Sequence, residues 1–285
     1  MVRSQPGAQN IYMVGIKNYF SRNFDGLLPR IRELNSKNIT CSISFFPKSG
    51  RTATDVKKNV EAYIKLLESI ANEKLNANVT IKLNQLGIYF DKKLTRDSLM
   101  QIVEYSKNLN IFVWVDMEIK GTINDSLEIF QEIYQKYQNT GICLQTYLKR
   151  TETDMHTILV KKIPLRLVKG FYNDSEFSNW NDVTLNFKNL MEHILKKSVL
   201  PAIATHDKEL IIEAKKIIKK HAISKAELQF FDGVSNDEAL KAAKEGFNVR
   251  LYMAYGNLFP YLKDVLPKID MSRAVQRILG IKKIR

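Results

Sequence analysis

Cysteine is scarce in this 285-residue chain, which contains only Cys41 and Cys143. Each lies in an apolar run, where a buried thiol packs as a small hydrophobic side chain. We therefore expect neither a disulfide framework nor a cysteine-based metal site, and a reducing cytosol fits this usage best. Histidine is scarce too. Its four residues are scattered, with no second histidine at metal-ligand spacing on a shared helix, so no zinc or iron site is expected.

Long apolar runs are absent as well. The first residues, MVRSQPGAQN, lack the apolar segment of a secretory signal. No window approaches the roughly 18 consecutive apolar residues of a membrane-spanning helix. We therefore expect a cytoplasmic protein that touches a membrane at most peripherally, on the inner face of the cell membrane. No Pro/Gly/Ser-rich linker or low-complexity tract marks a domain boundary.

Positive charge is in excess, with a formal net charge of +14. The lysines come mostly as pairs within helical segments such as LIIEAKKIIKKHA (210–222), where they alternate with apolar residues at helical spacing. This pattern is typical of the solvated face of amphipathic helices. No zinc-finger spacing, helix-turn-helix signal or ribonucleoprotein box accompanies it, so no nucleic-acid partner is predicted. Contact with anionic membrane lipid stays open as an alternative.

Short apolar runs alternate with longer stretches of 3.6-residue periodicity along the chain. The runs predict eight strands, at Asn38–Ser44, Val79–Leu83, Phe112–Met117, Gly141–Tyr147, Leu165–Lys169, Leu200–Ala204, Glu227–Phe231 and Asn248–Met253. The periodic stretches predict eight helices, near 54–73, 95–109, 124–138, 151–162, 181–197, 207–221, 235–246 and 258–280. The strands read as near-continuous apolar runs, as expected when both faces are buried in apolar surroundings.

Eight strands alternating with eight helices predict an α/β fold, a (β/α)₈ barrel in a single domain. Residues 1–37 would form lead-in helices packed on the barrel, and residues 38–285 would form the barrel itself. An open, doubly wound sheet is the structural alternative. That fold usually brings a Gly-rich dinucleotide loop after its first strand, and this sequence has none.

Polar residues gather at the predicted C-terminal ends of the strands, where a barrel carries its active site. They include Lys82, Asp116, Gln145, Arg166, Lys169, Thr205, His206, Gln229, Arg250 and Tyr252. A lone charge buried in a strand costs several kcal/mol unless it is paired. These residues therefore form either a buried ion-pair network that closes the barrel or a polar binding site. The surplus of cations favours a site for an anionic ligand, such as a pyrophosphate or a carboxylate.

Seven of these strand-end strings, in this order, resemble the proline dehydrogenase family. They are IKLNQLG (81–87), VDMEIK (115–120), LQTYLKR (144–150), LRLVKGFY (165–172), IATHD (203–207), ELQFFDGV (227–234) and VRLYMAYG (249–256). The resemblance implies a modified barrel whose last helix lies over the barrel mouth, with FAD bound non-covalently. It also implies a role in proline catabolism: L-proline is oxidised to pyrroline-5-carboxylate by hydride transfer to the flavin, and the electrons pass to a quinone at the membrane.

The resemblance also assigns roles to individual residues. Contacts to FAD would come from Gln145, Arg166, Val168, Lys169, Gly170, Thr205, His206 and Gln229, with Arg166 near the flavin N5 edge. The substrate site would be shaped by Lys82, Asp116, Phe171, Phe231 and Tyr252. In that site Lys82 would pair with the substrate carboxylate and Tyr252 would pack against the proline ring. The catalytic set would be Lys82, Asp116, Arg166 and Tyr252.

The last predicted helix departs from the family pattern. The family carries a sequence like Tyr-Leu-x-Arg-Arg-Leu-x-Glu, whose two arginines clamp the substrate carboxylate. Here the stretch reads YLKDVLPK (261–268), with Asp264 and Val265 in place of the arginines. Arg273 and Arg277, one helical turn apart, would replace the clamp if this helix is shifted. Three interpretations stay open: a proline dehydrogenase, a flavin enzyme for a different secondary amine, and a non-enzymatic paralogue that uses the barrel for binding.

Overall fold

The computed structural model describes residues 20–21, 23–47, 50–170 and 174–257. Its strands are β1 (Phe20–Ser21), β2 (Thr40–Phe46), β3 (Ala77–Lys82), β4 (Val113–Asp116), β5 (Thr140–Gln145), β6 (Leu165–Val168), β7 (Pro201–Ala204), β8 (Glu227–Phe231) and β9 (Asn248–Gly256). Strands β2 to β9 pair in parallel, and β9 pairs with both β8 and β2, so the eight strands close into a barrel. The predicted barrel is confirmed, and the open-sheet alternative is wrong.

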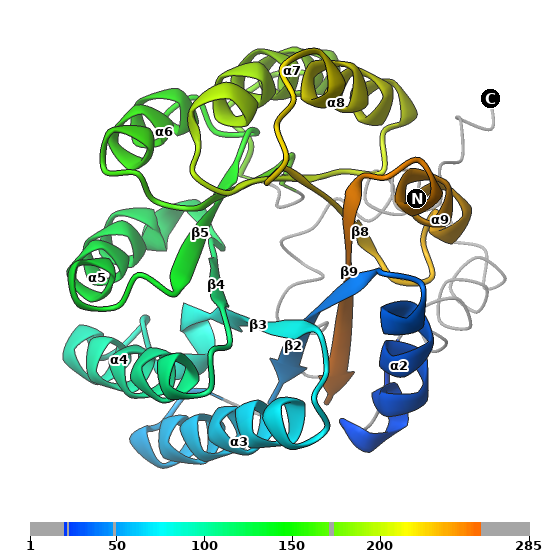
Figure 1. Ribbon diagram of the computed structural model, residues 1–285. Helices are drawn as coiled ribbons and strands as arrows, with labels where there is room; N and C mark the ends of the chain where they lie inside the picture. The colour runs from blue at the N-terminus through cyan, green and yellow to red at the C-terminus, as the bar shows by residue number, and fades with distance from the viewer. Residues whose placement is uncertain (1–19, 22, 48–49, 171–173, 258–285) are drawn as a thin grey trace, which may run out of the picture.

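Eight α-helices surround the barrel in the described part of the chain (Figure 1). They are α2 (Leu28–Ser36), α3 (Ala53–Asn72), α4 (Lys92–Asn108), α5 (Ile123–Lys136), α6 (Thr151–Val160), α7 (Trp180–Lys197), α8 (Lys208–Lys220) and α9 (Asn236–Lys244). Short 3₁₀ helices cover Asp25–Leu27, Leu83–Leu86 and Lys120–Thr122. Each α-helix precedes a strand in the chain. The predicted helix at 258–280 lies outside the described residues.

Helix α2 lies in the ring between α9 and α3 (Figure 1). In a barrel whose helices all follow their strands, the helix after the last strand would occupy that place. Here α2, which comes before the barrel strands in the chain, occupies that place. Its residues Ile31 and Leu34 are fully buried. The first barrel strand, β2, pairs with the last, β9, from Thr40 opposite Arg250 to Phe46 opposite Gly256. Both α2 and this β2–β9 pairing therefore join the two ends of the described chain.

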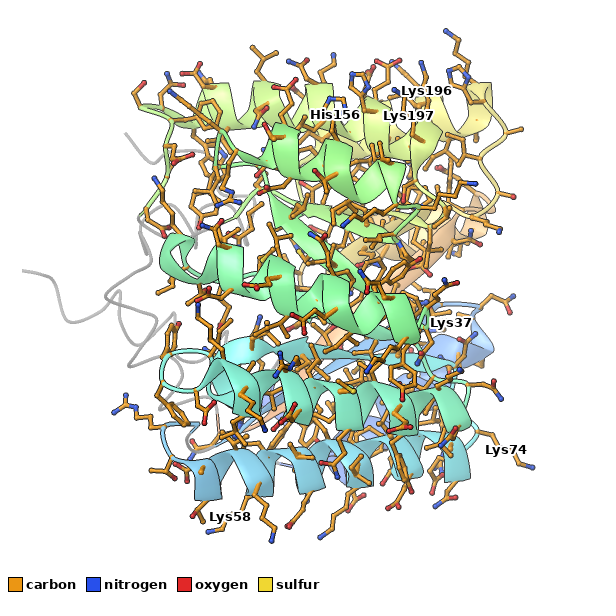
Figure 2. The ribbon with its side chains drawn as sticks, turned by 90° about the vertical axis from the view of Figure 1, so that its left-hand side faces the viewer. Lys37, Lys58, Lys74, His156, Lys196 and Lys197 are labelled. Carbon is orange, nitrogen blue, oxygen red and sulfur yellow. The ribbon has the colours of Figure 1, made fainter. Side chains whose placement is uncertain are left out.

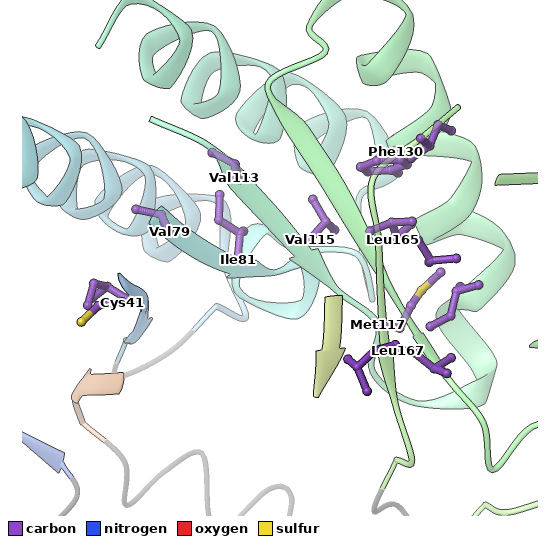
Figure 3. Close-up of a cluster of buried hydrophobic side chains, with 14 of the residues drawn as sticks. Cys41, Val79, Ile81, Val113, Val115, Met117, Phe130, Leu165 and Leu167 are labelled. Atoms are coloured by element: carbon purple, nitrogen blue, oxygen red, sulfur yellow. The ribbon is translucent and has the colours of Figure 1, made fainter. Parts of the chain in front are cut away.

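The apolar core lies between the strands and the surrounding helices. Alternate residues of a strand point to opposite faces of the sheet, and here one set packs in the main core cluster with helix residues such as Phe130 of α5. Figure 3 shows part of this layer, including Val79, Ile81, Val113, Val115, Leu165 and Leu167. Burying one such side chain stabilises the fold by about 1.5–3 kcal/mol.

The other set of strand residues forms the inner face of the barrel, and this face is polar. It includes buried Ser42, Thr80, Lys82, Asp116, Gln145, Arg166 and Gln229. The prediction that the strands are apolar on both faces is therefore wrong for the interior. This polar interior, called the lumen below, holds the candidate site.

Most lysines of the pairs are exposed on the outside, as the helical spacing predicted, whereas Lys215 is largely covered. Lys58 of α3 and Lys196 and Lys197 of α7 are exposed and project from the outer surface of the molecule (Figure 2). None of the described helices is long and apolar enough to span a membrane. Within the same residues, no group of three or more His, Cys, Asp or Glu side chains is arranged to hold a metal ion.

Candidate active site

Three charged side chains meet inside the barrel, near the C-terminal ends of their strands. Lys82 ends β3 and Asp116 ends β4, and the strand register places them side by side. The Lys82 Nζ donates to Asp116 Oδ2 at 2.8 Å, and the Arg166 Nη1, from β6, donates to Asp116 Oδ1 at 3.0 Å. All three residues are buried. This Asp116 cluster joins two positive charges to one negative charge.

Arg166 is further positioned by polar and aromatic neighbours. Its guanidinium lies over the Trp114 ring at 4.6 Å, and its Nη atoms contact the Thr80 and Ser42 hydroxyls at 3.4 Å. A desolvated cation–π contact contributes about 2 kcal/mol. The Nε of Arg166 is buried and has no hydrogen-bond partner among the described residues. These contacts therefore hold Arg166 in one orientation, and its Nε is a hydrogen-bond donor that a ligand could use.

Two glutamine amides on barrel strands are oriented by acceptors that cannot donate. The Gln145 Nε2, at the end of β5, donates to the Met117 carbonyl at 2.7 Å, and the Gln229 Nε2, from β8, donates to Glu227 Oε2 at 2.8 Å. A carbonyl or carboxylate only accepts, so each amide must turn its nitrogen toward that partner. The Gln145 Oε1 is buried and no described residue donates to it. Gln145 therefore offers an acceptor.

Aromatic side chains line the mouth next to β7, β8 and β9. The Phe231 ring stacks on His206 with centroids 5.6 Å apart, and Tyr252 meets Phe231 edge-on at 5.1 Å. Phe231 is 43% exposed, so the barrel mouth presents an apolar ring to solvent. Burial raises the pKa of the Tyr252 hydroxyl, which therefore stays protonated at neutral pH.

His206 is a neutral imidazole with a defined tautomer. Burial lowers its pKa to about 4, because the charged form would lose hydration. The backbone N–H of Phe231 donates to His206 Nε2 at 3.2 Å, so the proton of the neutral ring lies on Nδ1. That Nδ1 is buried without a partner among the described residues. His206 thus offers a second donor near the mouth.

Lys169 and Thr205 make contacts with the start of helix α8. The Lys169 Nζ donates to Asp207 Oδ2 at 2.7 Å and to Thr184 Oγ1 at 2.9 Å. Burial opposes ionisation of Asp207, but the hydrogen bond and charge of Lys169 outweigh it and lower the pKa of that carboxyl. Thr205 Oγ1 accepts from the Asp207 backbone N–H at 3.2 Å. Asp207 also caps α8, so the ATHD string fixes a helix N-terminus beside Lys169.

Gly170 follows β6 in a left-handed backbone conformation, with a φ of +87°. A Cβ atom here would lie 2.0 Å from Cδ1 of Tyr147, so the absence of a side chain lets that ring pack against the backbone. Val168, two residues earlier, ends β6, and its carbonyl accepts from the Thr146 N–H at 2.9 Å. Local packing alone therefore requires the glycine.

A second charged pair lies deeper in the lumen. Glu227, the first residue of β8, accepts from Arg250 Nε at 2.9 Å and from Arg250 Nη2 at 2.7 Å. Burial opposes ionisation of Glu227, but the charge and hydrogen bonds of Arg250 outweigh it and lower the pKa of the carboxyl. Arg250 Nη1 also donates to the Cys41 carbonyl at 2.9 Å. Glu227 and Arg250, called the floor pair below, therefore satisfy one another.

Asn78 connects the floor pair to the Asp116 cluster. With its amide turned to suit its neighbours, the Asn78 carbonyl accepts from Arg250 Nη1 and from Trp114 Nε1, each at 3.2 Å. Its nitrogen donates to Ser42 Oγ at 2.7 Å, and Ser42 contacts Arg166. A continuous set of hydrogen bonds thus runs from Arg250 up to Arg166.

The structure brings together Lys82, Asp116 and Arg166 in one cluster, and His206, Phe231 and Tyr252 in one aromatic group. Phe171, Asp264, Val265, Arg273 and Arg277 lie outside the described residues. Sequence reasoning missed four lumen residues that support Arg166 and Gln229: Ser42, Asn78, Trp114 and Glu227. The available signal was a polar or amphipathic residue at every second strand position, as in Asn78, Thr80 and Lys82.

A closed (β/α)₈ barrel with ionisable side chains converging at the C-terminal ends of its strands is the architecture of a barrel enzyme. A sequence model described as Proline dehydrogenase matches residues 27–264. Proline dehydrogenase 2 of Bacillus subtilis (strain 168) is 33% identical over 239 residues, which cover 82% of this chain and 79% of that protein. The chain therefore belongs to the proline dehydrogenase family, which is a family of oxidoreductases, as the strand-end motifs predicted.

Other similar proteins agree with this assignment. Proline dehydrogenase of Deinococcus radiodurans is 29% identical over 203 residues, covering 68% of this chain and 66% of that protein. Among solved structures, proline utilization A (PutA) from Bdellovibrio bacteriovorus, inactivated by N-propargylglycine, superimposes with a TM-score of 0.81 at 20% identity. PutA from Corynebacterium freiburgense gives 0.78 at 16% identity. The alignments cover 96% and 94% of this chain but only 33% and 31% of those longer chains, and they establish the fold.

Proposed function

We propose that this protein oxidises L-proline to pyrroline-5-carboxylate with FAD as cofactor and passes the electrons to a quinone. The observation that carries this proposal is the Asp116 cluster in the lumen of a proline dehydrogenase barrel. It places two cations against a single carboxylate, at the strand ends where barrel enzymes bind substrate. A substrate carboxylate would be attracted by these two cations.

The residues assigned to FAD offer hydrogen-bonding groups that a flavin could use. Arg166 Nε and His206 Nδ1 are buried donors, and Gln145 Oε1 is a buried acceptor, each without a partner among the described residues. Buried polar atoms are nearly always hydrogen-bonded in folded proteins, so such atoms indicate a missing partner. The flavin ring system carries both carbonyl acceptors and an N–H donor, and it therefore fits this mixed set. Val168, Lys169, Gly170, Thr205 and Gln229 complete the proposed cofactor contacts.

The chain's own side chains would bind and orient the substrate. Lys82 and Arg166 would attract its carboxylate, and Asp116 would hold both cations in place. Tyr252 and Phe231 would cover the ring and exclude water, which strengthens the charge interactions beside them. When bound, FAD supplies the acceptor for the electron pair removed from the amine.

The remaining parts of the proposal concern residues and partners beyond this cluster. Phe171 would add to the wall of the substrate site, and Arg273 or Arg277 would supply the second carboxylate contact in place of the family's arginine pair. Residues 38–285 would form the catalytic barrel, with residues 1–37 leading into it. The protein would reach a quinone by peripheral contact of its basic surface with the inner face of the cell membrane. Failure to sediment with anionic vesicles at low salt would count against that contact.

The test is the visible spectrum of the purified protein, followed anaerobically during titration with L-proline and, separately, with pyrrolidine, which lacks the carboxylate. We expect a flavin spectrum that bleaches with L-proline at far lower concentration than with pyrrolidine. Lys82→Met should raise the concentration needed by about 10- to 100-fold, because a hydrogen bond to a charged group contributes about 1.5–3 kcal/mol. Lys215→Met is the matched control: it removes a similarly covered lysine, which pairs with Glu238 and Glu245.

Each result decides between the interpretations. Bleaching by L-proline with the expected Lys82→Met effect supports a proline dehydrogenase. A flavin spectrum that bleaches with pyrrolidine but not with L-proline would indicate a different secondary amine, in line with Asp264 and Val265 at the family's arginine positions. No flavin, even after FAD is added, would overturn the enzymatic proposal in favour of a binding paralogue.

A further inference from the structure

Glu227 is a buried carboxylate to which the proposed function gives no role. Its side chain is only 12% exposed, and Arg250 binds both of its oxygens. A buried ion pair is often neutral or unfavourable for stability compared with apolar residues of the same volume. Stability alone therefore gives no reason for a charged pair at this place in the lumen.

Glu227 has a third hydrogen bond, and this one leads toward the barrel mouth. Glu227 and Gln229 are two residues apart on β8, so their side chains share the inner face of the barrel. The Gln229 Nε2 donates to Glu227 Oε2 at 2.8 Å. Among the described residues, none donates to the Gln229 Oε1. The amide oxygen therefore faces away from Glu227, toward the C-terminal end of β8.

The negative charge is what makes this amide orientation unique. An ionised carboxylate accepts hydrogen bonds and cannot donate them, so Gln229 can only turn its nitrogen toward it. Arg250 keeps Glu227 ionised by its charge and its two hydrogen bonds. A neutral amide at position 227 could donate or accept, and Gln229 could then adopt either orientation.

We propose that Glu227, held by Arg250, is a positioning residue that fixes the Gln229 amide with its oxygen toward the barrel mouth. Gln229 thereby presents an acceptor to an N–H or hydroxyl donor of the bound FAD, so this inference rests on the proposed function. Gln145 does the same from β5 with the Met117 carbonyl as its partner. The barrel then offers two preset acceptors, one set by a backbone carbonyl and the other by a buried charge.

A double-mutant cycle on FAD binding tests this role. The dissociation constant of FAD and the reduction potential of the bound flavin are measured for the wild type, Glu227→Gln, Gln229→Leu and the double variant. We expect Gln229→Leu to weaken FAD binding by about tenfold, the usual effect of losing one well-placed hydrogen bond. Glu227→Gln should weaken it by about twofold or more, because only molecules with the correct amide orientation then bind. In the Gln229→Leu background, Glu227→Gln should have no further effect on either flavin property. Its effect on thermal stability should be the same in both backgrounds.

Several results would contradict the inference. If Glu227→Gln lowers the melting temperature but leaves FAD affinity and flavin potential unchanged, the pair is only structural. If the two single effects on FAD binding add in the double variant, Glu227 does not act through Gln229. If Glu227→Gln does not fold, Glu227→Asp takes its place, because it keeps the charge beside Arg250 and shortens the reach to Gln229. Unchanged FAD binding by a folded Glu227→Asp variant overturns the proposal.

The inference and the proposed function fail in different ways. A wild type that binds no FAD overturns both. A wild type that binds FAD, together with variants that bind it equally well, overturns only the positioning role of Glu227.

Discussion

The lumen of this barrel contains two charged clusters, and they differ in how completely their polar atoms are bonded. In the floor pair, both carboxylate oxygens of Glu227 meet Arg250, whose remaining Nη1 donates to the Cys41 carbonyl. In the Asp116 cluster, two cations share one carboxylate, and the Arg166 Nε has no partner among the described residues. The floor pair joins one cation to one carboxylate, whereas the Asp116 cluster joins two cations to one carboxylate among the described residues.

This difference indicates that the two clusters have different roles. The floor pair organises the protein, whereas the Asp116 cluster is arranged to bind a ligand. Burying an ion pair is tolerable when its members satisfy each other, as Glu227 and Arg250 do. Leaving a donor unbonded costs about 1–3 kcal/mol, so a folded protein keeps such an atom only where something else compensates. Perturbed and unsatisfied groups are therefore expected at binding sites, and in this lumen they lie near the mouth.

Arg166→Met should have the largest effect. It removes one of the two cations that touch Asp116, the one whose Nε has no partner among the described residues. Loss of one preorganised electrostatic contact costs about 10²–10³-fold in rate. We expect kcat/KM for L-proline to fall by about 10³-fold, measured with an artificial electron acceptor. Urea unfolding should change less, because Asp116 keeps its bond to Lys82. Full activity in a folded Arg166→Met protein would break the distinction between the two clusters.

Arg250→Met should affect mainly stability. It leaves Glu227 buried without its cation, and breaking a buried pair in this way costs about 3–5 kcal/mol. The free energy of unfolding, measured with urea, should fall by that amount. The double variant Glu227→Gln/Arg250→Met should recover part of the loss, since no uncompensated charge remains. A double variant less stable than Arg250→Met would show that the pair is not a balanced unit.

The same substitution, glycine to alanine, can be compared at one glycine near each end of the barrel. Gly170, at the mouth, and Gly246, before β9, have φ values of +87° and +85°. Alanine costs about 1–2 kcal/mol in such a conformation at either position. At Gly170 the added Cβ would also meet the Tyr147 ring, which adds about 1–3 kcal/mol, whereas nothing lies within 4 Å at Gly246. Equal losses in unfolding free energy for Gly170→Ala and Gly246→Ala would show that the ring yields without cost.

His206 should give the smallest effect, visible only as a pH dependence. Its pKa is about 4 in the folded protein and about 6.5 when unfolded, so between these values the unfolded state binds more protons. The stabilisation from the neutral ring is complete above pH 6.5 and is lost as the pH falls to 4. His206→Gln lacks this contribution. The difference in melting temperature between wild type and variant should therefore shrink from pH 7 to pH 4, and a constant difference would contradict it.

The barrel could be predicted from the sequence because the alternation of apolar runs and amphipathic stretches is long and repetitive. Eight apolar runs separated by amphipathic stretches leave few other folds. The structure brings Lys82, Asp116 and Arg166 of the strand-end motifs together in one lumen. Strand boundaries shifted by a few residues, as for β2, which begins at Thr40 and extends to Phe46. Such shifts arise because strand pairing, not local composition, determines where a strand ends.

The alternation of Asn78, Thr80 and Lys82 signals a polar inner face, but the partners of the lumen residues could not be predicted from it. Ser42, Asn78 and Thr80 are small polar residues within strands, and nothing in their local sequence reveals that they support an arginine on β6. Glu227 and Arg250 are separated by 23 residues, and only the parallel register of β8 and β9 makes them partners. The family resemblance named Gly170 only as an FAD contact, but the local reason for this glycine is the packing of Tyr147, which precedes it by a whole helix and strand.

The pairing of β2 with β9 has a consequence for how this protein is made. Arg250 of β9 donates to the carbonyl of Cys41 of β2, 209 residues earlier in the chain. The second edge of β2, the first barrel strand, is therefore covered only by β9, the last one. Contacts so distant in sequence make folding slow, and an unpaired strand edge can associate with other chains in the meantime. Closure of the barrel therefore requires β9, the last strand of the described chain. Helix α2, which precedes the barrel strands β2 to β9 in the chain, packs against β2 beside this closing pair.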